Sequence, residues 1–378
     1  MSDLKTPETV RAPFMKGSGP LSTDTTGVLV AESKGRTGAS RILLGRDAIM
    51  IYALVAVVLI ACLSIPRFAS PVTVGFLLLD VIPILLIAMP MTLVIITGEI
   101  DLSVASTAGL TSAVIGVLWA NGGMDIWVVL LIGLLVGVVA GAFNGFLIAV
   151  VGLPSLAVTI GTLALFRGLA LVVIGDNAVA NFPPDLTAFF TSKIGSTGIP
   201  TVMIGVLVVV LLFGVLLHLT PFGRGLYALG YSTEAASFVG IKVARAKFWL
   251  YVGTGSVSAL AGIFWTLRYS SARSDNASGL ELAVIAAVLL GGVSIFGGKG
   301  SIPGVVAGVL LIGTINYALR LGRVSDVVLI IVTGTLLIAS VVAPSVFDSI
   351  KTWNHHRRIR RNLPPEPVRS STSASHQA

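Results

Sequence analysis

Long apolar runs separated by short polar or glycine-rich stretches make up most of the chain. A helix needs about 20 mostly apolar residues to cross a bilayer, and ten runs approach that length. They predict an all-α, polytopic integral membrane protein with about ten transmembrane helices. We expect Pro83 and Pro90 to break the second span, and Gly297–Gly300 to separate the eighth from the ninth. The ten runs are approximately 48–65, 74–96, 101–119, 126–150, 154–175, 200–219, 248–268, 281–297, 301–321 and 325–343.

The overall composition indicates that the solvent of this chain is a bilayer. Hydrophobic residues make up 55% of the 378 residues, charged residues only 11%, and the mean hydropathy is +0.97. Soluble domains carry roughly 25% charged residues, so a soluble fold of this size has no means to bury so much apolar surface. The single Cys62 excludes an intrachain disulfide, and three of the four histidines lie in or beside the polar C-terminal tail. We predict no catalytic site, cofactor, metal centre or nucleic-acid partner.

The distribution of Lys and Arg predicts the orientation of the chain. With both termini in the cytoplasm, most of the 25 Lys and Arg residues fall on the cytoplasmic side, as the positive-inside rule requires. Residues 1–46 and 346–378 are then disordered cytoplasmic tails, the second of them basic, around a transmembrane domain at 47–345. The loop 176–199 faces outside, and the basic loop 220–247 faces the cytoplasm.

A first candidate for function is TGEIDLSVAS, residues 97–106, where Glu99, Asp101 and Ser103 sit between apolar runs. One interpretation is an interfacial turn in which Asp101 or Ser103 caps the next helix while Glu99 is hydrated. The other is a broken helix that lines a transport pathway. Carboxylates at a membrane are costly, and interrupted helices recur near the substrate sites of transporters.

A second candidate is GGVSIFGGKGSIPG, residues 291–304, whose glycines and lysine raise the question of nucleotide binding. A phosphate loop needs a glycine, four residues and then Gly-Lys-Ser/Thr. Here Val293 occupies the leading position and a glycine follows Lys299, so we reject ATP binding. The alternatives are close helix packing or a second pathway-lining break, with Ser301 in a setting like that of Ser103. The two glycine-interrupted stretches also suggest an internal repeat.

A third candidate is YSTEAASFVGI, residues 231–241, in the basic cytoplasmic loop. It predicts a short helix that a hydroxyl side chain caps and Gly240 ends. Ala235 and Ala236 give this helix a small face, suited to a groove on a partner. A loop helix without a partner is the alternative.

The fourth candidate is LRYSSARSDNASGLEL, residues 267–282, which reaches Glu281 at the start of the next span. Its charged residues, among them Arg268 and Arg273, either face an external partner or polar solute or are hydrated loop residues. For any one of them the hydrated loop is the preferred interpretation.

These stretches resemble the permease subunits of bacterial ABC importers for monosaccharides and related small polyols, the ribose, xylose, rhamnose and autoinducer-2 group. GEIDLSVAS is similar to that family's Gly-Gly-Ile-Asp-Leu-Ser-Val-Gly-Ser signature, although Glu99 and Ala105 stand where the family has glycine. TPFGRGLYALGYSTEAASFVGI resembles its cytoplasmic loop, and GLELAVIAAVLLGGVSIFGGKGSIPGVVAG its late signature. VTIGTLALFRGLAL, residues 158–171, matches in character, and the resemblance covers about 48–343.

The resemblance implies a multi-pass protein of the bacterial inner membrane, in contact with membrane lipid, that works with several partners. Two permeases, identical or homologous, would form the pore, and ATP hydrolysis would belong to separate ABC ATPase subunits. An extracytoplasmic solute-binding protein would deliver the solute. Glu234, Ala235, Ala236 and Gly240 match the family's ATPase-coupling loop. The pathway candidates are Glu99, Asp101, Ser103, Glu281 and Ser301.

The solute and two competing classes of function complete the predictions. SSARSDNASGLEL looks closer to the rhamnose and autoinducer-2 permeases than to the ribose type, without separating the first two. An ion-coupled secondary transporter would carry several buried carboxylates, whereas the spans hold Asp80 and little else. A membrane-embedded lipid-processing enzyme would need a clustered set of polar groups, and the carboxylates here are scattered. The importer permease is therefore the favoured function.

Overall fold

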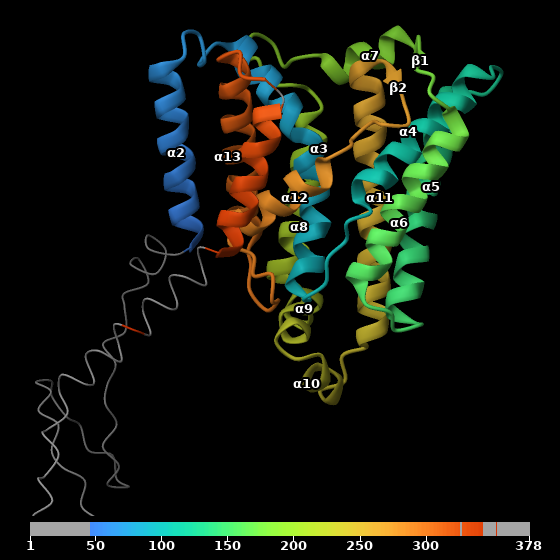
Figure 1. The fold of residues 1–378 in the computed structure, drawn as a ribbon, viewed down its shortest axis with the longest axis vertical. Helices are drawn as coiled ribbons and strands as arrows, with labels where there is room; N and C mark the ends of the chain where they lie inside the picture. The colour runs from blue at the N-terminus through green and yellow to red at the C-terminus, as the bar shows by residue number, and fades with distance from the viewer. Residues whose placement is uncertain (1–45, 326, 343–352, 354–378) are drawn as a thin grey trace, which may run out of the picture. The chain divides into compact units, whose positions relative to one another are not determined.

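A computed structural model describes residues 46–325, 327–342 and 353 (Figure 1). The all-α prediction is confirmed, since the strands within these ranges are one pair of two residues each. The predicted tails, 1–46 and 346–378, lie outside the described residues apart from residues 46 and 353. The elements are α2 (Arg46–Ser64), α3 (Pro71–Ile96), α4 (Val104–Ala120), α5 (Ile126–Ala149), α6 (Ser155–Ile174), β1 (Val179–Ala180), α7 (Pro184–Thr191), α8 (Met203–Leu219), α9 (Pro221–Tyr231), α10 (Thr233–Phe238), α11 (Val243–Tyr269), β2 (Ser271–Ala272), α12 (Leu280–Leu290), α13 (Ile302–Leu321) and a helix at Val327–Val342.

The ten predicted spans each coincide with a helix, but the helices differ in length. Six are long and apolar enough to cross a membrane: α2, α3, α5, α6, α11 and α13. A seventh candidate is α8 together with α9, which is bent from it by 68°. The remaining three, α4, α12 and Val327–Val342, are apolar but have only 10–17 residues. The predicted eighth span, 281–297, is shorter than expected because its helix ends at Leu290.

The predicted break at Pro83 and Pro90 is wrong, because α3 remains helical across both residues. Each proline removes one backbone N–H donor from the helix. Neighbouring helices surround this part of α3, where residues 81–97 are buried. Such surroundings allow proline inside a membrane helix, since packing and local adjustment compensate for the lost bond.

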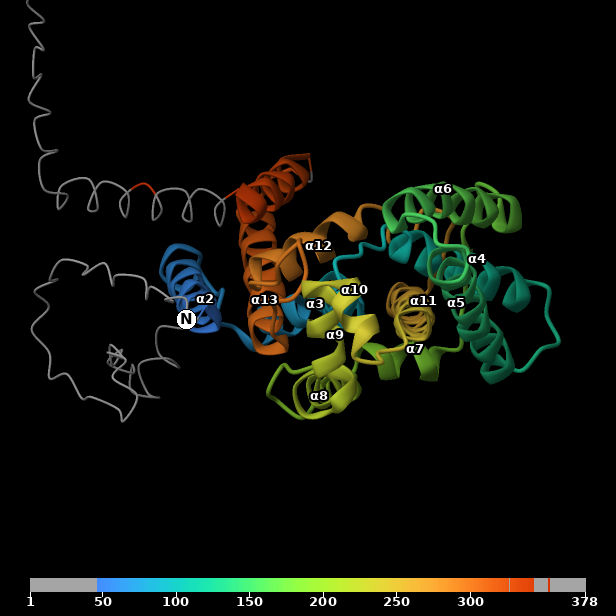
Figure 2. The same ribbon diagram turned by 90° about the horizontal axis from the view of Figure 1, so that it is seen from below.

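Two long helices, α3 and α11, form the interior of the bundle. Among the 18 most apolar consecutive residues of each of these helices, 72% are buried, against 6% in α2. Figure 2 shows α3 and α11 side by side, with α2 and α13 beyond α3 and with α4, α5 and α6 beyond α11. The buried core is centred on α3 and the helices that pack on it.

The contact of α5 with α11 depends on a row of glycines spaced four residues apart in α5. A Cβ atom on Gly141 would lie 3.1 Å from the Cα atom of Gly255, and one on Gly137 would collide with Ala259. Small residues at this spacing let two membrane helices approach closely. The approach fixes α11 against α5 over much of its length.

The two ends of the bundle carry different elements (Figure 1). We call one the α10 end, where α9, α10 and the loop 291–301 lie. The other is the α7 end, with α7 and the antiparallel pair β1–β2, in which Val179 pairs with Ala272 and Ala180 with Ser271.

Candidate functional site: the junction beside α10

The loop 291–301 lies against the end of α3 and against α9. The backbone N–H of Gly298 donates a hydrogen bond of 2.8 Å to the carbonyl of Ile96. The hydroxyl of Tyr227 in α9 donates one of 2.7 Å to the carbonyl of Gly300. The two glycine-interrupted stretches that the sequence singled out are thus in direct contact. We call this region, with helix α10, the α10 junction; it comprises Ile96–Gly98, Tyr227–Tyr231, Thr233–Phe238 and Phe296–Gly300.

Glycine is required at two places in the α10 junction. A Cβ atom on Gly230 would collide with the backbone of Ile96 and of Gly298. Gly298 has φ of +71°, a conformation that side chains rarely adopt, and its Cα faces the ring of Tyr231. Three chain segments therefore meet backbone to backbone.

Helix α10 is the short, capped helix that the sequence predicts. The Oγ atom of Ser232 accepts a hydrogen bond of 3.1 Å from the N–H of Ala235. At the other end, Gly240 has φ of +84° and its N–H donates to the carbonyl of Ser237 at 3.0 Å. Ser and Gly are favoured at these two positions, which explains why so short a segment is helical.

Ala235 and Ala236 do not together form the exposed small face that the sequence predicts for α10. Ala236 is buried and only 2% exposed, whereas Glu234 and Ala235 face solvent. The large side chains project instead, with Phe238 90% and Val239 75% exposed. The exposed surface of this loop therefore combines the bulky apolar side chains of Phe238 and Val239 with polar ones such as Glu234.

Between α3 and α4 the chain is not helical, and we call residues 97–103 the α10-side break. The Oδ1 atom of Asp101 accepts hydrogen bonds from the backbone N–H of Ser103 (2.9 Å) and from its hydroxyl (2.6 Å). The amide of Asn144 in α5 donates to the same hydroxyl at 2.8 Å. Asp101, Ser103 and Asn144 are all buried, with 1–2% of each exposed. A carboxylate, a hydroxyl and an amide thus form one buried polar cluster.

The interpretation of this break as an interfacial turn holds for Asp101, whose side chain accepts the N–H of Ser103 just before α4 as a capping residue does. It fails for Glu99, which is paired rather than simply hydrated. Ser103 stands at the N-cap position of α4, but its side chain makes no capping bond because it donates to Asp101. Glu99 is partly buried and forms an ion pair with Lys247 at the start of α11. Since α11 follows α10 along the chain, this ion pair ties the α10-side break to the segment that leaves α10.

A second non-helical stretch, residues 270–279 between α11 and α12, is the α7-side break; apart from β2 it has no regular structure. Nη1 of Arg167 in α6 donates to the carbonyls of Ser274 and Asn276, both at 2.9 Å. The Asn276 amide donates to the hydroxyl of Ser112 at 2.8 Å. The preferred interpretation of a hydrated residue fails for Arg268, whose side chain is 9% exposed and pairs with Asp80, and holds for the exposed Arg273.

The remaining two pathway candidates lie apart from each other. Ser301 caps α13, because its Oγ atom accepts the N–H of Gly304 at 3.2 Å. Its role thus differs from that of Ser103, whose side chain makes no cap. Glu281 lies in the first turn of α12, and its Oε2 atom is buried without a hydrogen-bond partner within the described part of the chain. The structure therefore gathers Glu99, Asp101 and Ser103 at one break, whereas Ser301 caps α13 and Glu281 lies at the start of α12.

Comparison with known proteins gives this arrangement a family. Residues 73–341 match the family described as branched-chain amino acid transport system / permease component. The chain is 35% identical over 302 residues to the autoinducer 2 import system permease protein LsrD of Salmonella typhimurium, which covers 78% of this chain and 90% of that protein. The chain belongs to this permease family.

Other relatives agree with this assignment. The permease is 36% identical over 291 residues to LsrD of Photorhabdus laumondii, covering 74% of this chain and 86% of that protein. It is 35% identical over 288 residues to LsrD of Yersinia enterocolitica, with the same coverage. No solved structure matches the chain. Family membership makes the protein a multi-pass transport permease rather than an enzyme.

Sequence reasoning missed several residues that belong to the α10 junction of the permease or contact its α10-side break. Asn144 carried a usable signal, because it is the one amide in the apolar run 126–150 and polar groups inside spans usually have a role. Tyr227 and Lys247 lay in a loop with many polar residues and carried no signal. Phe238 was overlooked because the sequence analysis assigned the partner-facing side of this helix to Ala235 and Ala236.

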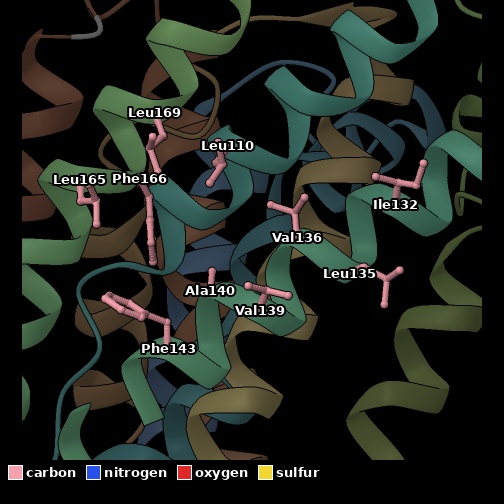
Figure 3. Close-up of a pocket in the computed structure, with 10 residues that line it drawn as sticks. All are labelled: Leu110, Ile132, Leu135, Val136, Val139, Ala140, Phe143, Leu165, Phe166 and Leu169. Carbon is pink, nitrogen blue, oxygen red and sulfur yellow. The ribbon is translucent and has the colours of Figure 1, made fainter. Parts of the chain in front are cut away.

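The permease also has an apolar groove of about 460 Å³ between α4, α5 and α6 (Figure 3). Its ten lining residues are all apolar, among them Leu110, Phe143 and Phe166. No lining side chain offers a hydrogen bond to a polar solute. The groove suits the acyl chain of a membrane lipid and is not a candidate for solute binding.

Proposed function

We propose that this permease is the transmembrane subunit of an ABC importer that moves a small polyol into the cytoplasm. The relatives are named for autoinducer 2 import, and the sequence resembles both the autoinducer-2 and the rhamnose permeases. ATP hydrolysis takes place on separate ATPase subunits, a second permease completes the pore, and an extracytoplasmic binding protein delivers the solute.

The observation that carries this proposal is the exposure of α10. Phe238 and Val239 project from the bundle, and Phe296 at the same end is 83% exposed. Such side chains contribute little to the stability of this chain, while an apolar patch with a charged rim is typical of a protein-binding surface. The short helix, with Glu234 on its exposed side, fits a groove on an ATPase.

The α10 junction supplies a path from the ATPase to the bundle. Closure of the ATPase subunits on ATP pushes α10, and the close backbone contacts of Gly230 carry the push to the end of α3. The α10-side break comes directly after α3 in the chain, and the Lys247–Glu99 ion pair couples this break to α11. Because α3 and α11 form the interior, a small shift of both changes the packing around the pore.

The orientation follows from this assignment. The α10 end faces the cytoplasm, with the tails 1–46 and 346–378 on the same side, and the α7 end faces the binding protein. The basic residues of the loop 220–247 and of the tails agree with the positive-inside rule.

The proposal is tested with Phe238→Ala in the complete importer, reconstituted in proteoliposomes with its ATPase and binding protein. Truncation of a central apolar anchor costs about 2 kcal/mol or more of binding energy, so ATP-driven uptake of labelled autoinducer 2 or L-rhamnose should fall about tenfold or more. Leu63→Ala is the matched control, since Leu63 in α2 is 87% exposed but lies away from α10. Equal uptake by the two variants would exclude α10 as the ATPase contact. Uptake without any ATPase would overturn the importer itself.

A further inference from the structure

A second cavity, at the α7 end, has the polar lining that the apolar groove lacks. It has a volume of about 220 Å³ and lies between α3, α11, α12 and α13. This volume is below the roughly 300–1,000 Å³ of pockets for drug-sized ligands, so it suits a smaller molecule. We call it the α7-end pocket; its lining includes Asp80, Trp265, Arg268, Tyr269, Asn316 and Tyr317.

Charged groups in this pocket are paired with one another. Asp80 forms an ion pair with Arg268, whose side chain is only 9% exposed, and a second one of 3.3 Å with Arg320 at the mouth. A guanidinium has five N–H donors and a carboxylate about four acceptor sites, more than this pairing uses. The Asp80–Arg268 pair therefore offers donors and acceptors to a bound molecule, and the one excess positive charge of the cluster lies on Arg320 at the exposed mouth.

One polar side-chain atom of the pocket lining is buried without a partner among the residues described. The Oδ1 atom of Asn316 accepts no hydrogen bond from the residues that the structure describes. A buried acceptor left without a donor destabilises a fold, so a native protein that keeps one usually has a use for it. A hydroxyl group of a ligand would supply the missing donor.

Aromatic rings supply the apolar part of the lining. The rings of Trp265 and Tyr269 lie 5.4 Å apart, and Tyr317 is on the opposite helix, α13. Flat apolar faces next to convergent hydrogen-bonding groups match a molecule that has both C–H faces and hydroxyl groups. Small polyols have both.

We propose that the α7-end pocket binds the solute inside the permease, and that it takes a neutral polyol. This inference rests on the proposed importer function, which places the α7 end on the side where the solute arrives. A zwitterionic amino acid would need to separate Asp80 from Arg268 to pair with both, whereas a polyol hydrogen-bonds to them as they stand. Ser278 and Gly279 of the α7-side break also line the pocket, so a bound solute contacts the chain where α12 begins.

Binding is measured directly with Trp265 as reporter. The chain has five tryptophans, and the other four are replaced by phenylalanine in the full-length permease. Titration with L-rhamnose or autoinducer 2 should change the Trp265 fluorescence in a saturable way, and leucine should not. Asn316→Leu should weaken the polyol about fivefold to tenfold, by loss of one hydrogen bond, and should not lower the unfolding temperature because it removes an unpaired buried oxygen.

The matched control is Ser258→Ala, which also removes a buried polar atom without a partner in the described ranges but lies outside the pocket. It should leave the polyol affinity unchanged. A saturable response to leucine, or no response to either polyol, overturns the pocket proposal. ATP-driven uptake by the complete importer separates the two proposals. If the importer takes up polyol but the Trp265 fluorescence does not change, only the pocket proposal is overturned. If ATP-dependent uptake is absent, the importer proposal is overturned.

Discussion

The two breaks in the bundle share a plan but differ in chemistry. Each follows one of the longest helices, α3 with 26 residues and α11 with 27, and each leads into a short apolar helix. Each buries polar residues: Thr97, Asp101 and Ser103 in the α10-side break and Asn276 in the α7-side break. The two breaks lie at opposite ends of the bundle, and the helices that precede them, α3 and α11, pack on each other (Figure 1).

The difference lies in how each break is held. Arg167 donates to two carbonyls of the α7-side break, and the β1–β2 pair holds its start. Hydroxyl and amide groups hold the α10-side break instead: Asn144 donates to Ser103 at 2.8 Å and Thr159 donates to the carbonyl of Ile100 at 3.3 Å. The Oδ1 atom of Asn144 is buried without a partner among the residues described. We infer that the α7-side break is a fixed element, while the α10-side break rearranges when α10 moves.

The largest effect is expected from Arg167→Ala, which removes the support of the α7-side break. Two partly buried carbonyl oxygens lose a charged donor, at about 1.5–3 kcal/mol for each such bond. The free energy of unfolding in detergent should fall by about 3–5 kcal/mol, or the protein should fail to accumulate. Arg273→Ala in the same stretch removes only the exposed pair with Asp275 and should leave the free energy of unfolding nearly unchanged. Equal stability losses would show that the break does not depend on Arg167.

A smaller effect, of a different kind, is expected from Asp101→Asn. The amide keeps an acceptor for Ser103 but loses the stronger charge-assisted bonds. Because a buried charge is itself costly, the free energy of unfolding should change by less than about 1 kcal/mol, while ATP-driven uptake should fall about tenfold. The experiment compares unfolding with uptake for the same preparation. Normal uptake with normal stability would remove Asp101 from the moving part.

The smallest effect is expected from reversal of the Glu99–Lys247 ion pair. Glu99→Lys or Lys247→Glu alone should lower stability and uptake, because both side chains are less than one-fifth exposed, at 16% and 17%. The double variant should recover most of the loss, with a coupling energy of about 1 kcal/mol. A double variant no better than the sum of the two single variants would indicate that this ion pair does not link the break to α11.

Ten helices of this permease were predictable because each produces an apolar run, which is read from the sequence without knowing which helices are neighbours. The helices α7 and α9 were not predicted, because they lie in the polar stretches 176–199 and 220–247. The short helix α10 was predictable for a similar reason, since Ser232 and Gly240 act through local backbone geometry. The continuity of α3 was not, because tolerance of Pro83 and Pro90 depends on the helices around them.

The candidate site was predictable only in part. Glu99, Asp101 and Ser103 were found because carboxylates are rare between spans. Their partners Asn144 and Lys247 lie more than 40 positions away along the chain, and one sequence does not show which helices are neighbours. The contact between Gly230 and Gly298 was unpredictable for the same reason.

The predicted internal repeat stays a prediction, but the structure changes its best alignment. By their position after a long interior helix, residues 270–279 are the counterpart of residues 97–103. The loop 291–301 follows a short helix instead and lies against the end of α3 as its spatial partner. The sequence had paired the two glycine-rich stretches because glycine content was the stronger signal.

Hydrogen exchange measured by mass spectrometry tests the central claim most directly, on the complete importer with and without a non-hydrolysable ATP analogue. The account predicts that exchange changes in residues 97–103 and in α10 when nucleotide binds, while residues 270–279 keep the same exchange. A change confined to residues 270–279, or an equal change in both breaks, would contradict it.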